Sequence, residues 1–245
     1  MIDRKVAVIT GATSGIGTAV AERMARDGYY TILLGRSIEK GNCISESIKS
    51  EGLCSVFLQC DVTSEESVSM VASTIVNNYG RVDMLFNNAG IMLQSKEIES
   101  LPVEEWKRTF ETNIDSVFLM MKYLKSAIFN CKGCIINNAS IAGMHSYIAG
   151  RSYAYSASKS ALIQFTRQMA LNYAEEGVRV NCICPGIIDT PILGDRDRSE
   201  YAKRVPLGYI GKPEDVANVV AFLVSDQASY LTGVVLPIDG GVSLN

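Results

Sequence analysis

Short, apolar, β-branched runs alternate with amphipathic runs along the whole chain, and this alternation is the strongest constraint on its fold. The predicted strands are Lys5–Thr10, Tyr30–Leu34, Cys54–Gln59, Val82–Phe86, Cys134–Asn137, Arg179–Ile183 and Val234–Ile238. The predicted helices are Gly17–Asp27, Ser37–Glu51, Thr63–Tyr79, Val103–Lys125, a segment carrying Tyr155, and Glu214–Val224 preceded by Pro213. Strands that alternate with helices predict a parallel sheet covered on both faces. We therefore expect one Rossmann-like, doubly wound α/β domain over residues 1–245.

The composition excludes several classes of protein. Of the 245 residues, 47% are hydrophobic and the net charge is −3, with no basic run that would attract nucleic acid. No apolar run reaches the roughly 18 residues that a membrane span needs. The first residues are too polar for a signal peptide, so we expect a cytoplasmic protein without a membrane partner.

The seven cysteines do not indicate a disulfide framework, because their number is odd and no signal peptide is recognisable. Cys131 and Cys134 have a metal-like spacing, but no second such pair accompanies them. The only histidine is His145. Since zinc needs four good ligands, we expect reduced cysteines and no metal site.

A glycine-rich turn follows the first predicted strand. In doubly wound sheets the ligand lies beyond the carboxyl ends of the strands. Glycines there allow a tight turn and a close approach of the backbone to a pyrophosphate, and the next helix offers free N–H groups. Three residues separate Gly11 from Gly15 and one separates Gly15 from Gly17, a spacing that differs from the usual Gly-x-Gly-x-x-Gly. The turn predicts a nucleotide site that includes Ser14 and Ile16.

The second strand is followed by Gly35, Arg36 and Ser37. An acid usually stands near this point when the ribose of the nucleotide has a free 2′-hydroxyl. A glycine removes the repulsion that a carboxylate would exert on a 2′-phosphate, and an arginine can bind that phosphate. These residues favour NADP over NAD. The alternative is that Arg36 stacks on the adenine and does not discriminate. Ser14 adds no basic charge, although its hydroxyl could reach a phosphate.

Polar residues also follow the other strands. Asp61 and Val62 come after the third strand, where the acid either accepts from an adenine amino group or precedes a helix cap. The small, polar turn Asn87–Gly90 follows the fourth strand and suits packing against a cofactor. Asn113 is a poor helix-interior residue, so it has either a functional reason or an exposed position. Ser140 follows the fifth strand, and Pro185–Thr190 follows the sixth.

Tyr155 and Lys159 are four residues apart. On a helix this spacing places both side chains on one face. An ammonium group favours phenolate over phenol, so Lys159 is expected to lower the pKa of Tyr155 towards the range of proton transfer near neutrality.

Taken together, these segments resemble the classical short-chain dehydrogenases/reductases over essentially the whole length. The matching series is Thr10–Gly17, Asp61, Asn87–Gly90, Asn113, Ser140, Tyr155 with Lys159, and Pro185–Thr190. The resemblance implies hydride transfer between a nicotinamide cofactor and an alcohol or carbonyl carbon. We expect NADP(H), with NAD(H) as the alternative.

The resemblance also implies catalytic roles. Tyr155 would be the acid in reduction and the base in oxidation. Lys159 would lower its pKa and bind the nicotinamide ribose. Ser140 would donate to the substrate oxygen, and Asn113 would hold a water that relays a proton to Lys159. The residues expected at the cofactor are Gly11, Ser14, Gly15, Ile16, Gly17, Arg36, Ser37, Asp61, Val62, Asn87, Ala89, Gly90, Tyr155, Lys159, Pro185, Gly186, Ile188 and Thr190.

Some features depart from the family pattern. Ser140 and Tyr155 are fifteen residues apart, slightly more than expected, which indicates a small insertion within Met144–Ser152. Tyr153 is six residues before Lys159 and should face elsewhere. Tyr209 stands where many relatives carry a basic residue.

Residues 191–212 are expected to form a substrate lid, since Leu193–Val205 is highly charged. His145 and Trp106 are interpreted as loop and helix-packing residues. The family usually forms homotetramers, and the small residues Ala154, Ala157, Ser158 and Ala161 would permit close helix packing.

Three kinds of substrate remain open within this class: a 3-oxoacyl-[acyl-carrier-protein], a hydroxysteroid, or a small or cyclic ketone. An acyl-carrier-protein partner would favour a basic patch, which acidic neighbours in Leu193–Val205 weaken. A non-catalytic dinucleotide sensor is the alternative from another class. It is disfavoured because Tyr155, Lys159, Ser140 and Asn113 are all present.

Overall fold

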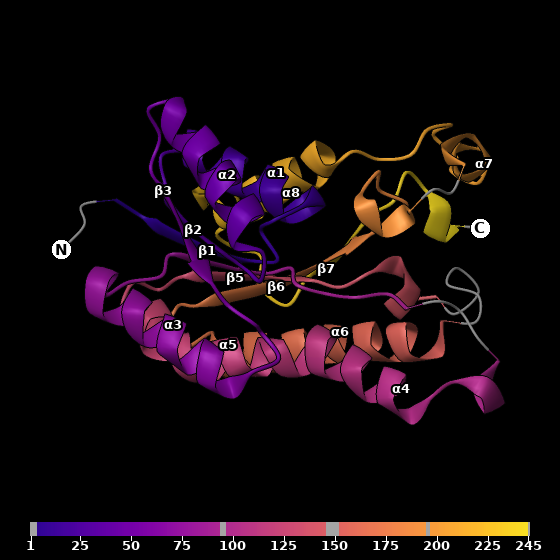
Figure 1. The fold of residues 1–245 in the computed structure, drawn as a ribbon, viewed down its shortest axis with the longest axis horizontal. Coiled ribbons are helices and arrows are strands. Elements are labelled where there is room, and N and C mark those ends of the chain that lie inside the picture. Colours follow the sequence, from indigo (N-terminus) through magenta and orange to yellow (C-terminus); the bar gives the residue numbers. More distant parts are fainter. Residues whose placement is uncertain (1–3, 94–96, 146–151, 195–196, 245) are drawn as a thin grey trace.

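Seven parallel strands form one sheet, in the order β3-β2-β1-β4-β5-β6-β7 (Figure 1). The structure, a computed structural model, describes residues 4–93, 97–145, 152–194 and 197–244. The strands are β1 (Val6–Thr10), β2 (Tyr30–Gly35), β3 (Ser55–Gln59), β4 (Met84–Asn87), β5 (Cys134–Asn138), β6 (Arg179–Pro185) and β7 (Val235–Ile238). Every described pairing is parallel, which confirms the predicted doubly wound α/β sheet.

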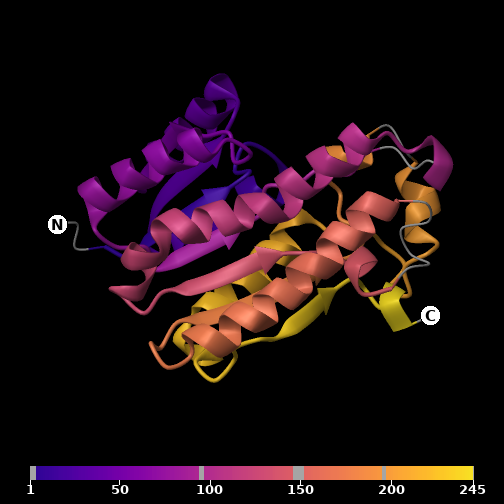
Figure 2. The same ribbon diagram turned by 90° about the horizontal axis from the view of Figure 1, so that it is seen from below.

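Helices cover both faces of this sheet, with α1, α2 and α8 on one face and α3, α5 and α6 on the other (Figures 1 and 2). The α-helices are α1 (Gly15–Arg26), α2 (Ile38–Ser50), α3 (Glu65–Tyr79), α4 (Val103–Phe110), α5 (Ser116–Phe129), α6 (Tyr153–Tyr173), α7 (Arg198–Ala202) and α8 (Pro213–Val224). Among the described residues, none of these helices combines the length and apolarity that crossing a membrane requires.

The core consists of two apolar layers separated by the sheet. Alternate residues of a strand point to opposite faces. Val8 and Leu85 accordingly pack into one layer, and Ile9 and Phe86 into the other, all of them fully buried. This two-sided burial explains why the central strands are continuously apolar.

The long helical segment after β4 is interrupted by a π-turn at Glu111–Asp115, between α4 and α5. The sequence predicts one helix over Val103–Lys125, whereas the segment continues to Phe129. Trp106 stacks on Phe110, with the ring centroids 4.9 Å apart. The interruption matters because Asn113 lies in its middle.

β1 and β4 are neighbours although β2 and β3 lie between them in the chain. The strand order therefore reverses at β1 and β4, and in doubly wound sheets a ligand binds at such a point, beyond the carboxyl ends of the strands. The carboxyl edge of the sheet is the end where α7 lies in Figure 1.

Candidate active site

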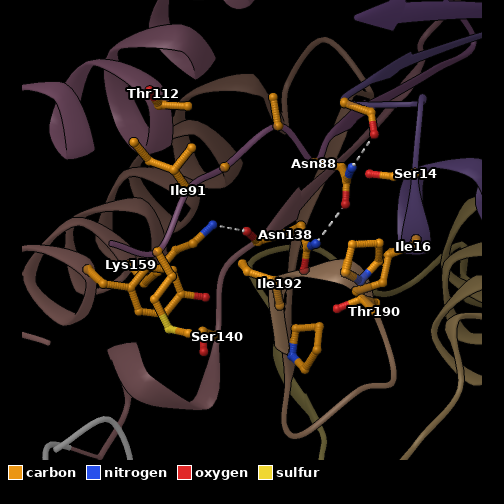
Figure 3. Close-up of a pocket in the computed structure, with 18 of the residues that line it drawn as sticks. Ser14, Ile16, Asn88, Ile91, Thr112, Asn138, Ser140, Lys159, Thr190 and Ile192 are labelled. Carbon is orange, nitrogen blue, oxygen red and sulfur yellow. Dashed lines mark hydrogen bonds between the residues drawn. The ribbon is translucent and has the colours of Figure 1, made fainter. Parts of the chain in front are cut away.

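A cavity of about 1120 Å³ occupies this carboxyl edge. Segments that follow β1, β2, β3, β4, β5 and β6 line it, together with α6 and α7 (Figure 3). Its volume slightly exceeds the range of about 300–1,000 Å³ that is usual for small-ligand sites.

The glycine turn after β1 forms one end of the cavity. Gly11 has a φ of +63°, and a Cβ atom there would lie 2.9 Å from the Cα of Ala89. Ser14 precedes α1 without a side-chain cap bond among the described residues, so the first N–H groups of α1 are free of a side-chain acceptor. A bare backbone and a helix N-terminus together suit a pyrophosphate. The turn therefore fits the phosphates of a dinucleotide.

Gly35, at the end of β2, has no space beside it for a side chain. A Cβ there would lie 2.6 Å from the methyl carbon of Thr13. Arg36 is exposed and lines the cavity. Two hydrogen bonds from Thr63, with the nearby charge of Arg36, lower the pKa of Asp61 against the effect of burial. Asp61 thus combines a turn-capping role with a place on the cavity wall.

The carboxyl ends of β1, β4 and β5 are joined by side chains. The Nδ2 of Asn88 donates to the main-chain oxygens of Thr10 and Gly11, at 3.0 and 3.1 Å. Its Oδ1 accepts from the Nδ2 of Asn138 at 2.9 Å, as Figure 3 shows. These bonds hold the glycine turn against the middle of the sheet.

Lys159 lies at the other end of the cavity, where it is only 4% exposed. Its Nζ donates to the main-chain oxygen of Asn138 at 2.7 Å. Burial disfavours the charged ammonium and lowers the pKa of Lys159 to about 8. The residue can therefore change its charge near neutral pH.

Tyr155 is half-buried one turn before Lys159 on α6. The Nζ of Lys159 lies 5.8 Å from the centroid of its ring. Burial raises the pKa of Tyr155, and a hydrogen bond with Ser140 opposes this rise. The expectation that Lys159 lowers this pKa is therefore wrong for the free chain, because desolvation dominates and the amine faces Asn138.

Ser140 caps a short 3-10 turn, Ile141–Gly143, that follows β5. Its Oγ accepts from the N–H of Ala142 at 3.1 Å. The turn is fixed to α6 because the hydroxyl of Ser160 donates to the oxygen of Gly143 at 2.7 Å. The proton of the Ser140 hydroxyl is thereby left for Tyr155 or a substrate oxygen.

Asn113 is fully buried within the π-turn. Its Oδ1 accepts from the N–H of Ile91 at 2.8 Å, and its Nδ2 donates to the oxygen of Ile91 and to Ser158, each at 3.0 Å. The asparagine thus braces the segment that follows Gly90. A Cβ on Gly90 would lie 3.2 Å from the Oδ1 of Asn113 and 3.3 Å from the Nζ of Lys159.

Most of the predicted site residues meet at this one cavity. The predicted residues that line it are Gly11, Ser14, Gly15, Ile16, Arg36, Asp61, Val62, Ala89, Gly90, Ser140, Tyr155, Lys159, Pro185, Gly186, Ile188 and Thr190.

Four predicted residues do not line the described part of the cavity. Gly17 packs under the turn, where a Cβ would lie 2.3 Å from the oxygen of Gly11. Ser37 caps α2 by accepting from the N–H of Lys40. Asn87 is buried and donates to Asn137, and Asn113 is buried as described above. These four act behind the cavity wall.

The sequence prediction missed several lining residues. Asn88 and Asn138 were not distinguished from their neighbours, because only the pairing of β4 with β5 brings them together. The apolar part of the wall includes Met92, Leu93, Ile141, Ile192 and Leu193, and the polar part adds Thr13, Arg108, Thr112, Tyr201 and Arg204.

The charged segment that was predicted as a lid includes α7. Arg198 pairs with Asp189 at 3.1 Å, and Lys203 pairs with Glu200 at 2.5 Å. Tyr201 lines the cavity from α7.

Three residues flagged in the sequence lie off the described cavity wall. Tyr153 and Tyr209 are exposed. The N–H of His145 donates to Ile141. The predicted insertion around Met144–Ser152 falls largely on residues 146–151, outside the described residues.

Comparison with known proteins gives matches over the whole fold. Residues 11–243 match the family model described as enoyl-(acyl-carrier-protein) reductase. Meso-2,3-butanediol dehydrogenase of Serratia marcescens is 34% identical, over 98% of this chain and 95% of the relative.

Two solved structures are also similar, each at 31% identity with a TM-score of 0.92. A variant of actinorhodin polyketide ketoreductase with NADPH covers 99% of this chain and 98% of its own. The 3-ketoacyl-(acyl-carrier-protein) reductase of Brucella melitensis with NADH covers 98% of both chains. The chain belongs to the short-chain dehydrogenase/reductase family and is an NAD(P)-dependent oxidoreductase acting on alcohol or ketone substrates.

Proposed function

We propose that the protein transfers a hydride between NADP(H) and a ketone or secondary alcohol, with Tyr155 as the proton-transferring residue. The observation that carries this proposal is that Ser140, Tyr155 and Lys159 line the same cavity as the glycine turn. When bound, the dinucleotide supplies or accepts the hydride. The turn at Gly11 and the N-terminus of α1 would hold its phosphates.

The side chains divide the proton chemistry among them. Tyr155 protonates the substrate oxygen in reduction and removes the proton in oxidation. Ser140 donates to the same oxygen as negative charge develops on it. Lys159 binds the nicotinamide ribose and, when charged, favours the phenolate. Asn113 holds the main chain at Ile91. Through that main chain it would hold the water that relays a proton to Lys159.

The preference for NADP over NAD rests on the end of β2. Arg36 is exposed on the cavity wall, and no described carboxylate lies within 4.0 Å of its guanidinium. Thr13 fills the space that a side chain at Gly35 would need. An acid that would repel a 2′-phosphate is thereby excluded. In separate titrations we expect NADPH to bind more tightly than NADH, with the difference lost in Arg36→Ala. Equal affinities in the unaltered protein would contradict the assignment.

The apolar part of the cavity wall favours an apolar ketone of small or medium size. Met92, Leu93, Ile192 and Leu193 belong to this part and offer no charge to a substrate. A 3-oxoacyl chain on a carrier protein is the second candidate. It is less favoured because acidic partners neutralise Arg198 and Lys203 in the segment that would face an acidic carrier.

Two further features belong to the proposal. Residues 191–212 would act as a lid, because Tyr201 and Arg204 line the cavity from this segment.

The protein would form a homotetramer, although Ala154 and Ser158 are buried within the chain and so do not support it. Analytical ultracentrifugation measures the assembly directly.

The deciding experiment compares the unaltered protein with Tyr155→Phe on a panel of ketones with NADPH. We expect kcat to fall by about 10³-fold or more, with the Kd for NADPH within a factor of about 2–3. Tyr153→Phe is the matched control, because this neighbouring tyrosine is exposed outside the cavity. Full activity of Tyr155→Phe would overturn the mechanism.

A further inference from the structure

A continuous series of hydrogen bonds crosses the floor of the cavity from the glycine turn to Lys159 (Figure 3). Asn88 donates to the main-chain oxygens of Thr10 and Gly11, Asn138 donates to Asn88, and Lys159 donates to the main-chain oxygen of Asn138. Asn138 is the middle member, since its side chain and its carbonyl group serve the two ends. The series joins the proposed phosphate site to the proposed proton-transfer site.

The direction of these bonds is determined by chemistry. Main-chain oxygens can only accept, so the NH2 group of Asn88 must face Thr10 and Gly11. The Oδ1 of Asn88 is then the atom that faces Asn138. Asn138 must therefore present its own NH2 group, because two facing acceptors would repel each other. Any residue that replaces Asn138 has to supply a donor at this point.

The side-chain oxygen of Asn138 is evidence against a role in packing alone. Its Oδ1 is buried and has no hydrogen-bond partner among the residues that the structure describes. A buried, unpaired oxygen lowers stability. A leucine would occupy a similar volume without that cost. The amide is therefore explained by the bond that its Nδ2 donates to Asn88.

We propose that Asn138 is a positioning residue that couples the glycine turn to Lys159. It acts through Asn88, whose orientation it fixes, and through the carbonyl oxygen that holds the Nζ of Lys159. Asn138 is 8% exposed at the end of β5, where its side chain and its carbonyl group contact the two ends of the series. This inference rests on the proposed function, because it assumes that a dinucleotide occupies the turn.

The test measures cofactor binding directly, by titrating Asn138→Leu and Asn138→Ser with NADPH and with NADH. Leucine fills the volume but cannot donate, and serine is too short to reach Asn88. We expect both variants to raise the Kd of both cofactors by about tenfold, since the turn holds the phosphates that the two cofactors share. A packing role predicts a different result, in which leucine retains binding and serine loses it.

Asn181→Leu is the matched control. Asn181 is a buried asparagine of β6 whose amide bonds to Leu231 and Val234, outside the described cavity wall. We expect it to lower Tm without changing the Kd of the cofactor. Should Asn138→Leu fail to fold, as judged by circular dichroism and Tm, Asn138→Ser carries the test.

A double-mutant cycle with Asn88→Ala tests whether Asn138 acts on the glycine turn through Asn88. If Asn138 acts through Asn88, the combined variant Asn88→Ala with Asn138→Leu binds no more weakly than Asn88→Ala alone. Additive losses would overturn the proposal, as would cofactor affinities of Asn138→Leu and Asn138→Ser within twofold of the unaltered protein. Absence of dinucleotide binding by the unaltered protein would instead overturn the proposed function, so the two failures are distinct.

Discussion

Lys159 and Tyr155 share one face of α6, yet the amine of Lys159 donates to the main-chain oxygen of Asn138 at 2.7 Å and stays 5.8 Å from the centroid of the Tyr155 ring. Burial in the free chain lowers the pKa of Lys159 and raises that of Tyr155. Each group is thus shifted towards its neutral form. A charge that favours the phenolate must come from Lys159 when protonated or from the oxidised nicotinamide.

The depressed pKa of Lys159 predicts a specific dependence of stability on pH. Between pH 8 and 10.5 the unfolded chain binds a proton at Lys159 that the folded chain does not, so the free energy of unfolding rises with pH across this window. Relative to Lys159→Met, the full rise is about 3 kcal/mol. Urea denaturation of both proteins from pH 7.5 to 10 measures the difference. Parallel curves for the unaltered protein and Lys159→Met would contradict the prediction.

Ser140→Ala should slow catalysis without affecting the cofactor. Removing the donor to the substrate oxygen is expected to lower kcat by about 10²–10³-fold. Loss of the bond from Ala142 should lower stability by about 1 kcal/mol, a separate effect visible in Tm. Ser140→Thr keeps the hydroxyl and should recover much of the activity. Steady-state kinetics with NADPH distinguish the variants, and an unchanged kcat in Ser140→Ala would refute the role.

A carboxylate at position 35 should not by itself convert the protein to NAD. In Gly35→Asp the new Cβ meets the methyl group of Thr13 at 2.6 Å, so we expect weaker binding of NADPH and NADH alike. Adding Thr13→Ala removes the clash, and the double variant should bind NADH more tightly than Gly35→Asp does. Fluorescence titration gives both affinities. Tight NADH binding by Gly35→Asp alone would show that Thr13 does not control this position.

Asn113→Leu should destabilise the segment after Gly90. The substitution removes three hydrogen bonds and leaves the N–H and C=O groups of Ile91 without their partner. We expect the free energy of unfolding to fall by about 2–4 kcal/mol, with faster hydrogen exchange around Ile91. Asn113→Asp keeps the acceptor for the Ile91 N–H group and should protect that amide better. Unchanged exchange in Asn113→Leu would mean that the side chain does not brace this segment.

The fold was predictable because its strands are buried on both faces and therefore appear as unbroken apolar runs. β1, β2 and β3 begin and end within a residue of their predicted bounds, and Ser37 caps α2 at the predicted start of that helix. The interruption of the long helix was not predictable, since hydrophobic spacing does not report a π-turn that is centred on a polar residue.

The site was predictable where chemistry follows a strand end directly. It was not predictable where two distant segments meet. Asn88 and Asn138 are fifty residues apart and become partners only through the register of β4 with β5. The pKa of Tyr155 was mispredicted for a related reason: spacing identifies Lys159 as a neighbour, whereas burial, which the spacing does not report, determines the direction of the shift.

The π-turn at Glu111–Asp115 also determines the phase of the helix that follows it. A π-turn contains one more residue than an α-turn. Every later side chain is therefore rotated by about 100° around the axis, relative to its place in an uninterrupted α-helix of the same length. Met120, Leu124 and Ile128 pack into the apolar layer of the sheet with this phase. Deleting one residue from the turn would let it close as a regular α-turn and would leave the later side chains in nearly the same phase. Adding one residue would instead rotate that stripe away from the sheet. A single-residue deletion within Glu111–Asp115 should therefore be more compatible with the fold than a single-residue insertion between α4 and α5.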